Sequence, residues 1–242
     1  MRSTHRVAII GGTGAETLGA DPGIRRRTVA TPYGTVEVQQ AGPLLFLSRH
    51  GAAYVAPHNI NARANISALV QEGVTHVLAT AACGSMDGSL APGDLALLTD
   101  FVDFTRTRAC TFDPDGPPAY TDMSEPYDRD LRALILEAAA GLGAQVRAEA
   151  VYACTEGPRF ETRAEIRAYR RLGCQLVGMT QVPEVVLARE AGLPYAALAI
   201  VTNFAAGMQS VISEEEVRTM MAARGRTALS ILEEVVQLLS SA

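Results

Sequence analysis

The sequence predicts an α/β protein in which helices cover a central β-sheet. Apolar runs that fit buried strands alternate with helical patterns through the second half of the chain, and this alternation is typical of such a fold. The chain has 242 residues, of which 48% are hydrophobic and 19% charged. It can therefore bury a sizeable core, and we expect one large domain spanning residues 1–242.

Strands are expected where short apolar runs end in glycine, proline or small polar residues. Such runs lie at residues 7–10, 35–40, 44–48, 76–84, 94–104, 148–157, 175–180 and 195–203. The second and third runs flank Ala41-Gly42-Pro43 and fit the two strands of a hairpin.

Helices are expected where apolar residues recur at helical spacing. These segments lie at residues 61–72, 128–142, 161–172, 183–192 and 213–239. Pro183 suits the first position of its helix, and Ser213 followed three residues later by Glu216 is typical of a capped helix start. The segment FDPDGPPAY at residues 112–120 has the composition of a loop.

Charge and composition argue against several functions. The net charge of −5 argues against nonspecific nucleic-acid binding. All 21 basic residues are arginine. The chain therefore lacks the lysine of a Walker motif, of a Tyr-Lys dehydrogenase pair and of a Schiff-base enzyme.

The four cysteines, at positions 83, 110, 154 and 174, are scattered, with no C-x-x-C pair and no histidine at metal-ligand spacing. We therefore expect reduced thiols, no bound metal and a cytoplasmic protein. No apolar run approaches the roughly 20 residues that a membrane span needs. The run VAII near the start is too short for a secretory signal, so we expect no membrane partner.

Unusual polar and glycine-rich stretches follow the predicted strands. They are GGTG (11–14), SRHG (48–51), AACGS (81–85), TEGPRFET (155–162), GMTQ (178–181) and TNFAAG (202–207). Ligands of α/β proteins bind at the carboxyl ends of strands. These stretches therefore mark the candidate site.

The GGTG turn has three interpretations. Its backbone N–H groups suit an anion, but the turn also fits a plain tight connection. A dinucleotide fingerprint would need glycine or alanine where Thr17 stands, and an acidic residue at a strand end about 20 residues further on. The motif alone leaves the choice open.

Arg49 and His50 stand together at the end of a strand. An arginine fork matches phosphate oxygens and a histidine adds a second donor, although a surface arginine beside a structural histidine gives the same pattern. Thr13 and Thr180 also stand at strand ends, and together these residues favour a phosphate site. We expect the polar head of Arg49 to be available to phosphate. Replacing Arg49 by alanine should therefore alter the phosphate kinetics with little loss of stability.

Phe160 and Glu161 stand side by side after Gly157-Pro158. Phe160 could belong to the core, and Glu161 could be an acid in the first turn of a helix. Asn203 ends a buried strand, where an amide needs a partner because a buried unpaired polar group is costly. An aromatic face, a carboxylate and an amide together favour a purine site.

These stretches resemble those of the trimeric purine nucleoside phosphorylase and methylthioadenosine phosphorylase family. The resemblance runs in one order from residue 7 to about residue 207 and includes IIGGTG, SRHG, NINARANISAL, AACGS, PGDLALLTDFVD, TEGPRFETRAEIR, VGMTQVPEVVLAREAGLPYA and IVTNFAAG. It implies a single-domain nucleoside phosphorylase fold, with a mixed central β-sheet flanked by helices, and a homotrimer. It also implies that orthophosphate, as co-substrate, attacks C1′ of a purine nucleoside without a metal or organic cofactor. The products would be the free base and ribose 1-phosphate, or its 5-methylthio analogue.

The resemblance also implies roles for individual residues. Phosphate would be bound by Thr13, Arg49, His50, the backbone of Ala82 and Thr180. The nucleoside would be bound by Cys83, Gly84, Phe160, Glu161, Met179, Asn203, Ala205 and Val217. Met179 would lie against the ribose and Val217 at the 5′ end. Catalysis would rest on Asn203, Glu161 and His50.

The family divides at two of these positions. Its methylthioadenosine enzymes carry aspartates in the TNFA segment and a small residue after the phenylalanine of GPRF, whereas its 6-oxopurine enzymes carry asparagine and glutamate. Asn203, Glu161 and Ala205 therefore resemble the 6-oxopurine branch, closest to the bacterial methylthioinosine phosphorylases. The chain departs from the family at Ala62, usually an aromatic residue, and at Tyr120, where methylthioadenosine enzymes place a histidine that reaches the neighbouring subunit.

We therefore expect phosphorolysis of purine nucleosides with a preference for 6-oxopurines, 5′-methylthioinosine among them. The alternatives are a methylthioadenosine phosphorylase, a nucleosidase in which water replaces phosphate, and a nucleotide sensor without turnover. The combination of Arg49 and His50 with Glu161 and Asn203 argues against the sensor, since a sensor would not need both sets.

Overall fold

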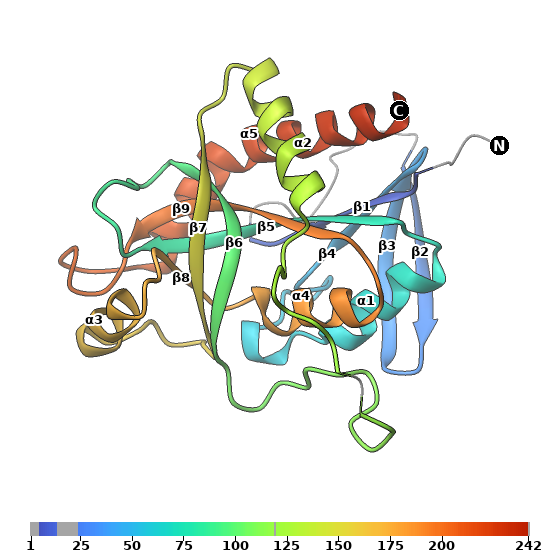
Figure 1. Ribbon diagram of the computed structural model, residues 1–242, viewed down its shortest axis with the longest axis horizontal. Coiled ribbons are helices and arrows are strands. Elements are labelled where there is room, and N and C mark those ends of the chain that lie inside the picture. Colours follow the sequence, from blue (N-terminus) through green and yellow to red (C-terminus); the bar gives the residue numbers. More distant parts are fainter. Residues whose placement is uncertain (1–4, 14–23, 119, 242) are drawn as a thin grey trace.

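The computed structural model describes residues 5–13, 24–118 and 120–241 of the chain (Figure 1). Its strands are β1 Val7–Gly11, β2 Arg25–Thr31, β3 Gly34–Ala41, β4 Leu44–Ser48, β5 His76–Ser85, β6 Leu95–Phe104, β7 Val146–Thr155, β8 Leu176–Gly178 and β9 Tyr195–Phe204. Its helices are the 3₁₀ turn η1 Pro57–Asn59 and the α-helices α1 Ala62–Gln71, α2 Arg129–Gly141, α3 Arg163–Arg171, α4 Gln181–Glu190 and α5 Glu214–Ser241. These elements confirm the expected mixed α/β fold.

The strands that the structure describes form one sheet in the order β2-β3-β4-β1-β5-β8-β7-β6-β9. The sheet is mixed: β1 runs parallel to β4 and β5, whereas β3 runs antiparallel to β2 and β4. In addition, β9 pairs in parallel with β5 and in antiparallel fashion with β6. The strands β5, β8, β7, β6 and β9 therefore close into a ring.

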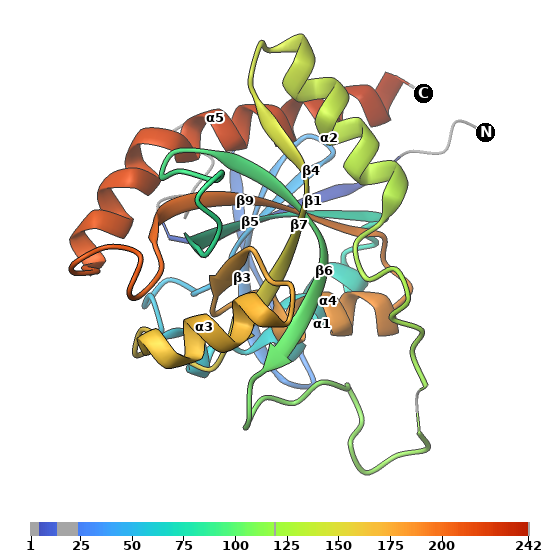
Figure 2. The ribbon, with the colours of Figure 1, turned by 60° about the vertical axis from the view of Figure 1, so that its left-hand side comes forward.

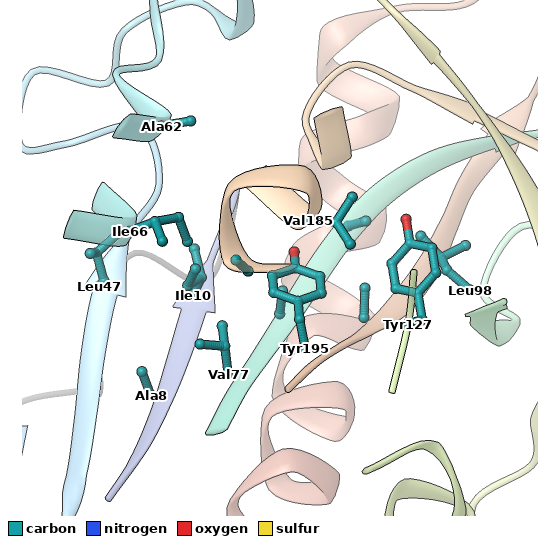
Figure 3. Close-up of a cluster of buried hydrophobic side chains, with 14 of the residues drawn as sticks. Ala8, Ile10, Leu47, Ala62, Ile66, Val77, Leu98, Tyr127, Val185 and Tyr195 are labelled. Atoms are coloured by element: carbon teal, nitrogen blue, oxygen red, sulfur yellow. The ribbon is translucent and has the colours of Figure 1, made fainter. Parts of the chain in front are cut away.

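Helices cover both faces of the sheet. In Figure 1, α2 and α5 lie above the strands and α1 and α4 lie below them. Ile9 of β1 belongs to the same apolar cluster as Ile135 of α2. Its neighbour Ile10 points the other way, into a cluster with Ile66 of α1 and Val185 of α4 (Figure 3). A strand covered on both faces consists of consecutive apolar residues, which is why VAII could be recognised as a strand.

The ends of the helices follow the sequence signals. Thr162 caps α3 together with Glu165 in a reciprocal capping box. The Oγ atom of Ser213 accepts a hydrogen bond from the backbone N–H of Glu216 at 3.1 Å, as predicted for the start of α5. Val182 in α4 has non-helical backbone angles, so the regular helix begins with the proline that follows it. No helix in the described part of the chain is long and apolar enough to cross a lipid bilayer.

Strand β2 was not predicted from the sequence. Its residues RRRTVAT are mostly exposed, and only Val29 is buried. The strand lies at the edge of the sheet and pairs with β3 alone. Exposed charged side chains are typical of edge strands, because they discourage pairing with another chain, and they conceal the apolar alternation by which strands are recognised.

Candidate active site

A cavity of about 360 Å³ lies beyond the ends of β5, β8 and β9, a size typical of small-molecule sites. Figure 2 brings forward this side of the molecule, where the ends of β5 and β9 lie between α3 and the first turns of α5. Every predicted site residue except Arg49 lines the cavity, namely Thr13, His50, Ala82, Cys83, Gly84, Phe160, Glu161, Met179, Thr180, Asn203, Ala205 and Val217. The fold thus brings together residues from seven separate stretches of sequence.

One end of the cavity is formed by Thr13, after β1, and His50, after β4. The Nδ1 atom of His50 lies 2.8 Å from the carbonyl oxygen of Val55. Because a carbonyl oxygen only accepts, Nδ1 carries a proton and donates this hydrogen bond. The imidazole stacks on Tyr54 at 4.8 Å between ring centroids, and the Tyr54 hydroxyl is hydrogen-bonded to that of Thr13. Tyr54 therefore links two of the predicted phosphate ligands.

Arg49 lies behind this end of the cavity rather than in its wall. Its side chain is 1% exposed, and its Nε and Nη2 atoms donate to the two carboxylate oxygens of Glu184 at 2.7 and 2.8 Å. Its Nη1 atom donates to the carbonyl oxygen of Thr80 at 2.9 Å. Burial by itself lowers the pKa of Arg49, but the Glu184 carboxylate outweighs burial and raises that pKa above its usual value. Arg49 is therefore a permanently charged and firmly oriented cation.

The glycine-rich turn lies directly against this guanidinium group. A Cβ atom on Gly12 would lie 2.9 Å from Nη1 of Arg49, so a larger residue at position 12 would displace the arginine. The backbone N–H of Gly12 donates to Thr80 Oγ1 at 3.3 Å. Gly14 and Thr17 lie outside the described residues. The close approach to a buried cation supports the anion-binding interpretation of the turn.

Thr180 completes this end of the cavity at the start of α4. Its side chain makes no capping hydrogen bond within the described structure, so its hydroxyl group can serve a ligand. The N-terminus of a helix favours negative charge. Together with Thr13 and His50, this position suits a phosphate group.

Glu161 and Phe160 form a second group in the cavity wall. Oε1 of Glu161 accepts a hydrogen bond from Oγ1 of Thr155 at 2.7 Å. Burial raises the pKa of Glu161, and the Thr155 hydrogen bond opposes that change. Glu161 precedes the cap residue Thr162 and so lies outside α3, which excludes its interpretation as a first-turn helix acid. Phe160 is 39% exposed and lines the cavity, so it is not a core residue.

Asn203 reaches the cavity through a β-bulge. Cys83 of β5 pairs with Val201 of β9, but the next residue, Gly84, pairs with Asn203, so Thr202 is the extra residue. A bulge redirects the side chain that follows it. A Cβ atom on Gly84 would lie 3.2 Å from Nδ2 of Asn203, so the glycine leaves room for the amide.

The amide of Asn203 is held by its own strand. Its Oδ1 accepts from Thr202 Oγ1 at 2.7 Å, and its Nδ2 donates to the carbonyl oxygen of Phe204 at 3.0 Å. An amide nitrogen can donate two hydrogen bonds and its oxygen can accept two. Asn203 can therefore donate one further hydrogen bond and accept one further hydrogen bond in the cavity.

The rest of the wall is mostly apolar. Its lining includes Ile212 before α5, Val217 in the first turn of α5 and Pro57 of η1, with Glu214 as the charged exception. Among the described residues, no group of three or more histidine, cysteine, aspartate or glutamate side chains is arranged to hold a metal ion. The cavity wall thus combines hydroxyl groups near a buried cation, an amide and a carboxylate, and apolar side chains.

The sequence matches the profile of the Phosphorylase superfamily over residues 6–237. The chain belongs to this superfamily. A probable 6-oxopurine nucleoside phosphorylase of Moorella thermoacetica is 46% identical to it over 239 residues, which cover 96% of this chain and 92% of that protein. A probable S-methyl-5′-thioinosine phosphorylase of Methanopyrus kandleri is 48% identical over 210 residues, covering 84% of this chain and 80% of that protein.

Solved structures of the superfamily share the fold. The methylthioadenosine phosphorylase from Schistosoma mansoni in complex with adenine superimposes with a TM-score of 0.91 at 34% identity, covering 98% of this chain and 92% of that one. The family resemblance and the fold expected from the sequence are therefore confirmed.

Sequence reasoning missed Tyr54, Thr155 and Glu184 as contributors to the site. Glu184 is separated from Arg49 by 135 residues, so no local pattern shows their pairing. Thr155 begins the quoted stretch TEGPRFET, but a single threonine before glycine and proline gives no signal for a hydrogen bond to Glu161. An acid within the apolar run VPEVVLA was the available hint for Glu184.

Proposed function

We propose that this chain catalyses the phosphorolysis of 6-oxopurine nucleosides. The observation that supports this most is that Asn203 and Glu161, which suit the edge of a 6-oxopurine, line the same cavity as Thr13, His50 and Thr180, which suit a phosphate. The 6-oxopurine nucleoside phosphorylase of Pyrococcus furiosus is 43% identical to this chain and matches 97% of it. The probable 6-oxopurine nucleoside phosphorylase of Moorella thermoacetica matches 96% of it.

In this reaction a phosphate oxygen forms a bond to C1′ while the C1′–N9 bond breaks, and its electron pair moves onto the purine. We assign the phosphate to Thr13, His50, Thr180 and the backbone of Ala82. Arg49 supplies positive charge from behind. Of the five N–H groups of its guanidinium, three are engaged by Glu184 and Thr80, and these hydrogen bonds hold the cation in place.

The base end stabilises the leaving purine. The further donor of Asn203 pairs with O6, and this contact strengthens as negative charge moves onto the base. When N7 of the leaving purine takes a proton from solvent water, its N–H donates to the further acceptor of Asn203. Glu161 accepts from N1–H. A 6-aminopurine presents a lone pair at N1 and donors at N6, which leaves buried groups unpaired. Matched polar contacts of this kind discriminate by factors on the order of 10⁴.

The 5′ end of the nucleoside faces the apolar wall with Ile212 and Val217. This wall supports 5′-methylthioinosine as a substrate beside inosine and guanosine, with Met179 against the ribose. We propose that orthophosphate is the only co-substrate and that no metal or organic cofactor takes part. A cytoplasmic location remains our prediction from the scattered cysteines.

We further propose a homotrimer. Tyr120, in the loop between β6 and α2, is 95% exposed, and this loop extends away from the body of the molecule in Figures 1 and 2. An aromatic side chain so exposed suits contact with a neighbouring subunit. Light scattering should give a mass of about 77 kDa, three times the 25.6 kDa chain. A fully active monomer would contradict this assembly.

A substrate panel tests the function. Inosine, guanosine, adenosine, 5′-methylthioinosine and 5′-methylthioadenosine are each assayed with and without phosphate. We expect turnover only with phosphate, and kcat/KM at least about 10²-fold higher for the 6-oxopurines than for their 6-amino counterparts. Equal turnover of methylthioadenosine and methylthioinosine would favour a methylthioadenosine phosphorylase instead. Turnover that ignores phosphate would identify a nucleosidase, and binding without turnover a sensor.

A further inference from the structure

Thr155 contacts Glu161 from outside the cavity. It is the last residue of β7, and its Oγ1 atom lies 2.7 Å from Oε1 of Glu161 and 3.3 Å from the carbonyl oxygen of Gly178. Both Thr155 and Glu161 are buried. The carbonyl oxygen of Thr155 is in turn held by Nη2 of Arg108 at 3.2 Å. The position of the hydroxyl group relative to Glu161 is thus fixed by its strand and by a buried arginine.

The hydroxyl group has only one proton to donate. Its shorter contact is to the Glu161 carboxylate, and a hydrogen bond to an ionised acceptor is stronger than one to a neutral carbonyl. While Glu161 is ionised, the proton therefore points at Oε1. This occupies one carboxylate oxygen and leaves Oε2 as the oxygen that can meet a base.

We propose that Thr155 is a positioning residue for base specificity, whose hydroxyl group keeps Glu161 in the ionised form that only accepts hydrogen bonds. An ionised Oε2 accepts from the N1–H of a 6-oxopurine and faces the lone pair at N1 of a 6-aminopurine. A protonated Glu161 would instead donate to N1 of a 6-aminopurine. The inference rests on the proposed function, since it concerns the base that occupies this cavity.

The surroundings of Glu161 make this hydrogen bond consequential. Burial raises the pKa of Glu161, and the negative charge of Glu165 acts in the same direction. The Thr155 hydroxyl, the backbone N–H of Glu161 and the positive charge of Arg159 lower that pKa. Arg159 and Glu165 are bonded to each other at 2.7 and 2.9 Å, so their opposite effects largely offset each other. The Thr155 hydroxyl is thus a principal group that opposes burial.

Two variants separate the hydroxyl group from the shape of the side chain. Thr155→Val removes the hydroxyl and keeps the branched shape, whereas Thr155→Ser keeps the hydroxyl. We would measure kcat/KM against pH for a 6-oxopurine nucleoside and its 6-amino counterpart at saturating phosphate. Calorimetric binding of hypoxanthine and adenine over the same pH range gives a readout that needs no turnover and is independent of phosphate titration.

For T155V we expect the acidic limb of the 6-oxopurine profile to move up by about one pH unit, because the ionised form has lost a charge-assisted hydrogen bond. On that limb kcat/KM for the 6-oxopurine then falls about tenfold, while the value for the 6-aminopurine does not fall. Hypoxanthine binding should show the same shift. T155S should keep the wild-type profile.

Identical profiles for T155V and T155S would overturn the inference, as would an equal loss for both base classes with no movement of the limb. If T155V does not fold, Thr155→Ala removes the same hydroxyl and is judged by the same criteria. A different result would refute the proposed function itself, namely a wild-type protein that shows no preference for 6-oxopurines. A wild-type preference that the Thr155 variants leave unchanged refutes only the role of Thr155.

Discussion

Replacing Arg49 by alanine should destabilise the protein as well as weaken phosphate binding. The sequence alone suggested an arginine whose polar head is available to phosphate, and hence little loss of stability. The structure instead buries Arg49 and Glu184 together, each with a side chain 1% exposed. Removing the arginine leaves the Glu184 carboxylate buried without its cation, with the hydroxyl of Tyr195 at 2.6 Å still bonded to Oε1.

The magnitude follows from the geometry of the pair. Breaking a buried ion pair by removing one partner costs about 3–5 kcal/mol, because the remaining charge stays buried. The bidentate geometry, at 2.7 and 2.8 Å, favours the upper part of that range. Domains are stable by only about 5–15 kcal/mol. The expected loss is therefore a large share of the total.

Urea unfolding at a fixed protein concentration measures this loss. Arg129→Ala is a matched control, because Arg129 also pairs with a glutamate, Glu125, but its side chain is 78% exposed. An exposed pair contributes about 0.2–1 kcal/mol at most. The control should therefore unfold close to the wild-type urea concentration, and Arg49→Ala well below it.

A double variant separates stability from ligand binding. Arg49→Met combined with Glu184→Leu replaces the pair by apolar side chains, which is often neutral or stabilising for a buried pair. It should regain much of the stability and still show a phosphate KM raised about tenfold or more, since the cation is lost. If Arg49→Ala unfolds at the same urea concentration as Arg129→Ala, the reasoning about the buried pair is refuted.

Three further results are expected. Asn203→Asp should shift the kcat/KM ratio toward 6-aminopurines and lower the absolute rate, because Glu161 still opposes an unprotonated N1; an unchanged ratio would contradict the base assignment. Gly84→Ala should lower nucleoside kcat/KM about tenfold, since its Cβ would lie 3.2 Å from Asn203 Nδ2. Gly88→Ala, whose Cβ meets nothing within 4 Å, is the control and should match wild type. Burial raises the pKa of Cys154 to about 12, so mass spectrometry should find this thiol unmodified by iodoacetamide at pH 8 until urea unfolds the protein.

Much of the site could be predicted because its parts are local in sequence. Each contributing stretch consists of an apolar run followed by polar or glycine residues, as in LLFLSRHG, which contains His50, and IVTNFAAG, which contains Asn203. The strands β4, β1, β5 and β9 run parallel, so their carboxyl ends lie on one side of the sheet. Polar residues at those ends therefore meet in space even when the strand order is unknown.

The remaining features depend on contacts that no local pattern contains. The burial of Arg49 depends on Glu184, which lies in helix α4 far along the chain. The bulge at Thr202 is a register shift between two strands, and either strand by itself looks regular. Strand β2 carries exposed arginines in place of an apolar alternation, so its existence follows only from its partner β3.

The two side chains assigned to the base share one structural device. Oδ1 of Asn203 accepts from Thr202, and Oε1 of Glu161 accepts from Thr155, each at 2.7 Å and each from a buried threonine hydroxyl. An oxygen that accepts a hydrogen bond from a hydroxyl group acts as an acceptor and not as a donor in that contact. The two threonines, Thr155 behind the cavity and Thr202 in its wall, therefore fix which atoms can donate and which can accept at the base edge. A change of base preference in this fold should accordingly require changes at Thr155 and Thr202 as well as at Glu161 and Asn203, because the new side chains would otherwise meet hydroxyl groups oriented for the old ones.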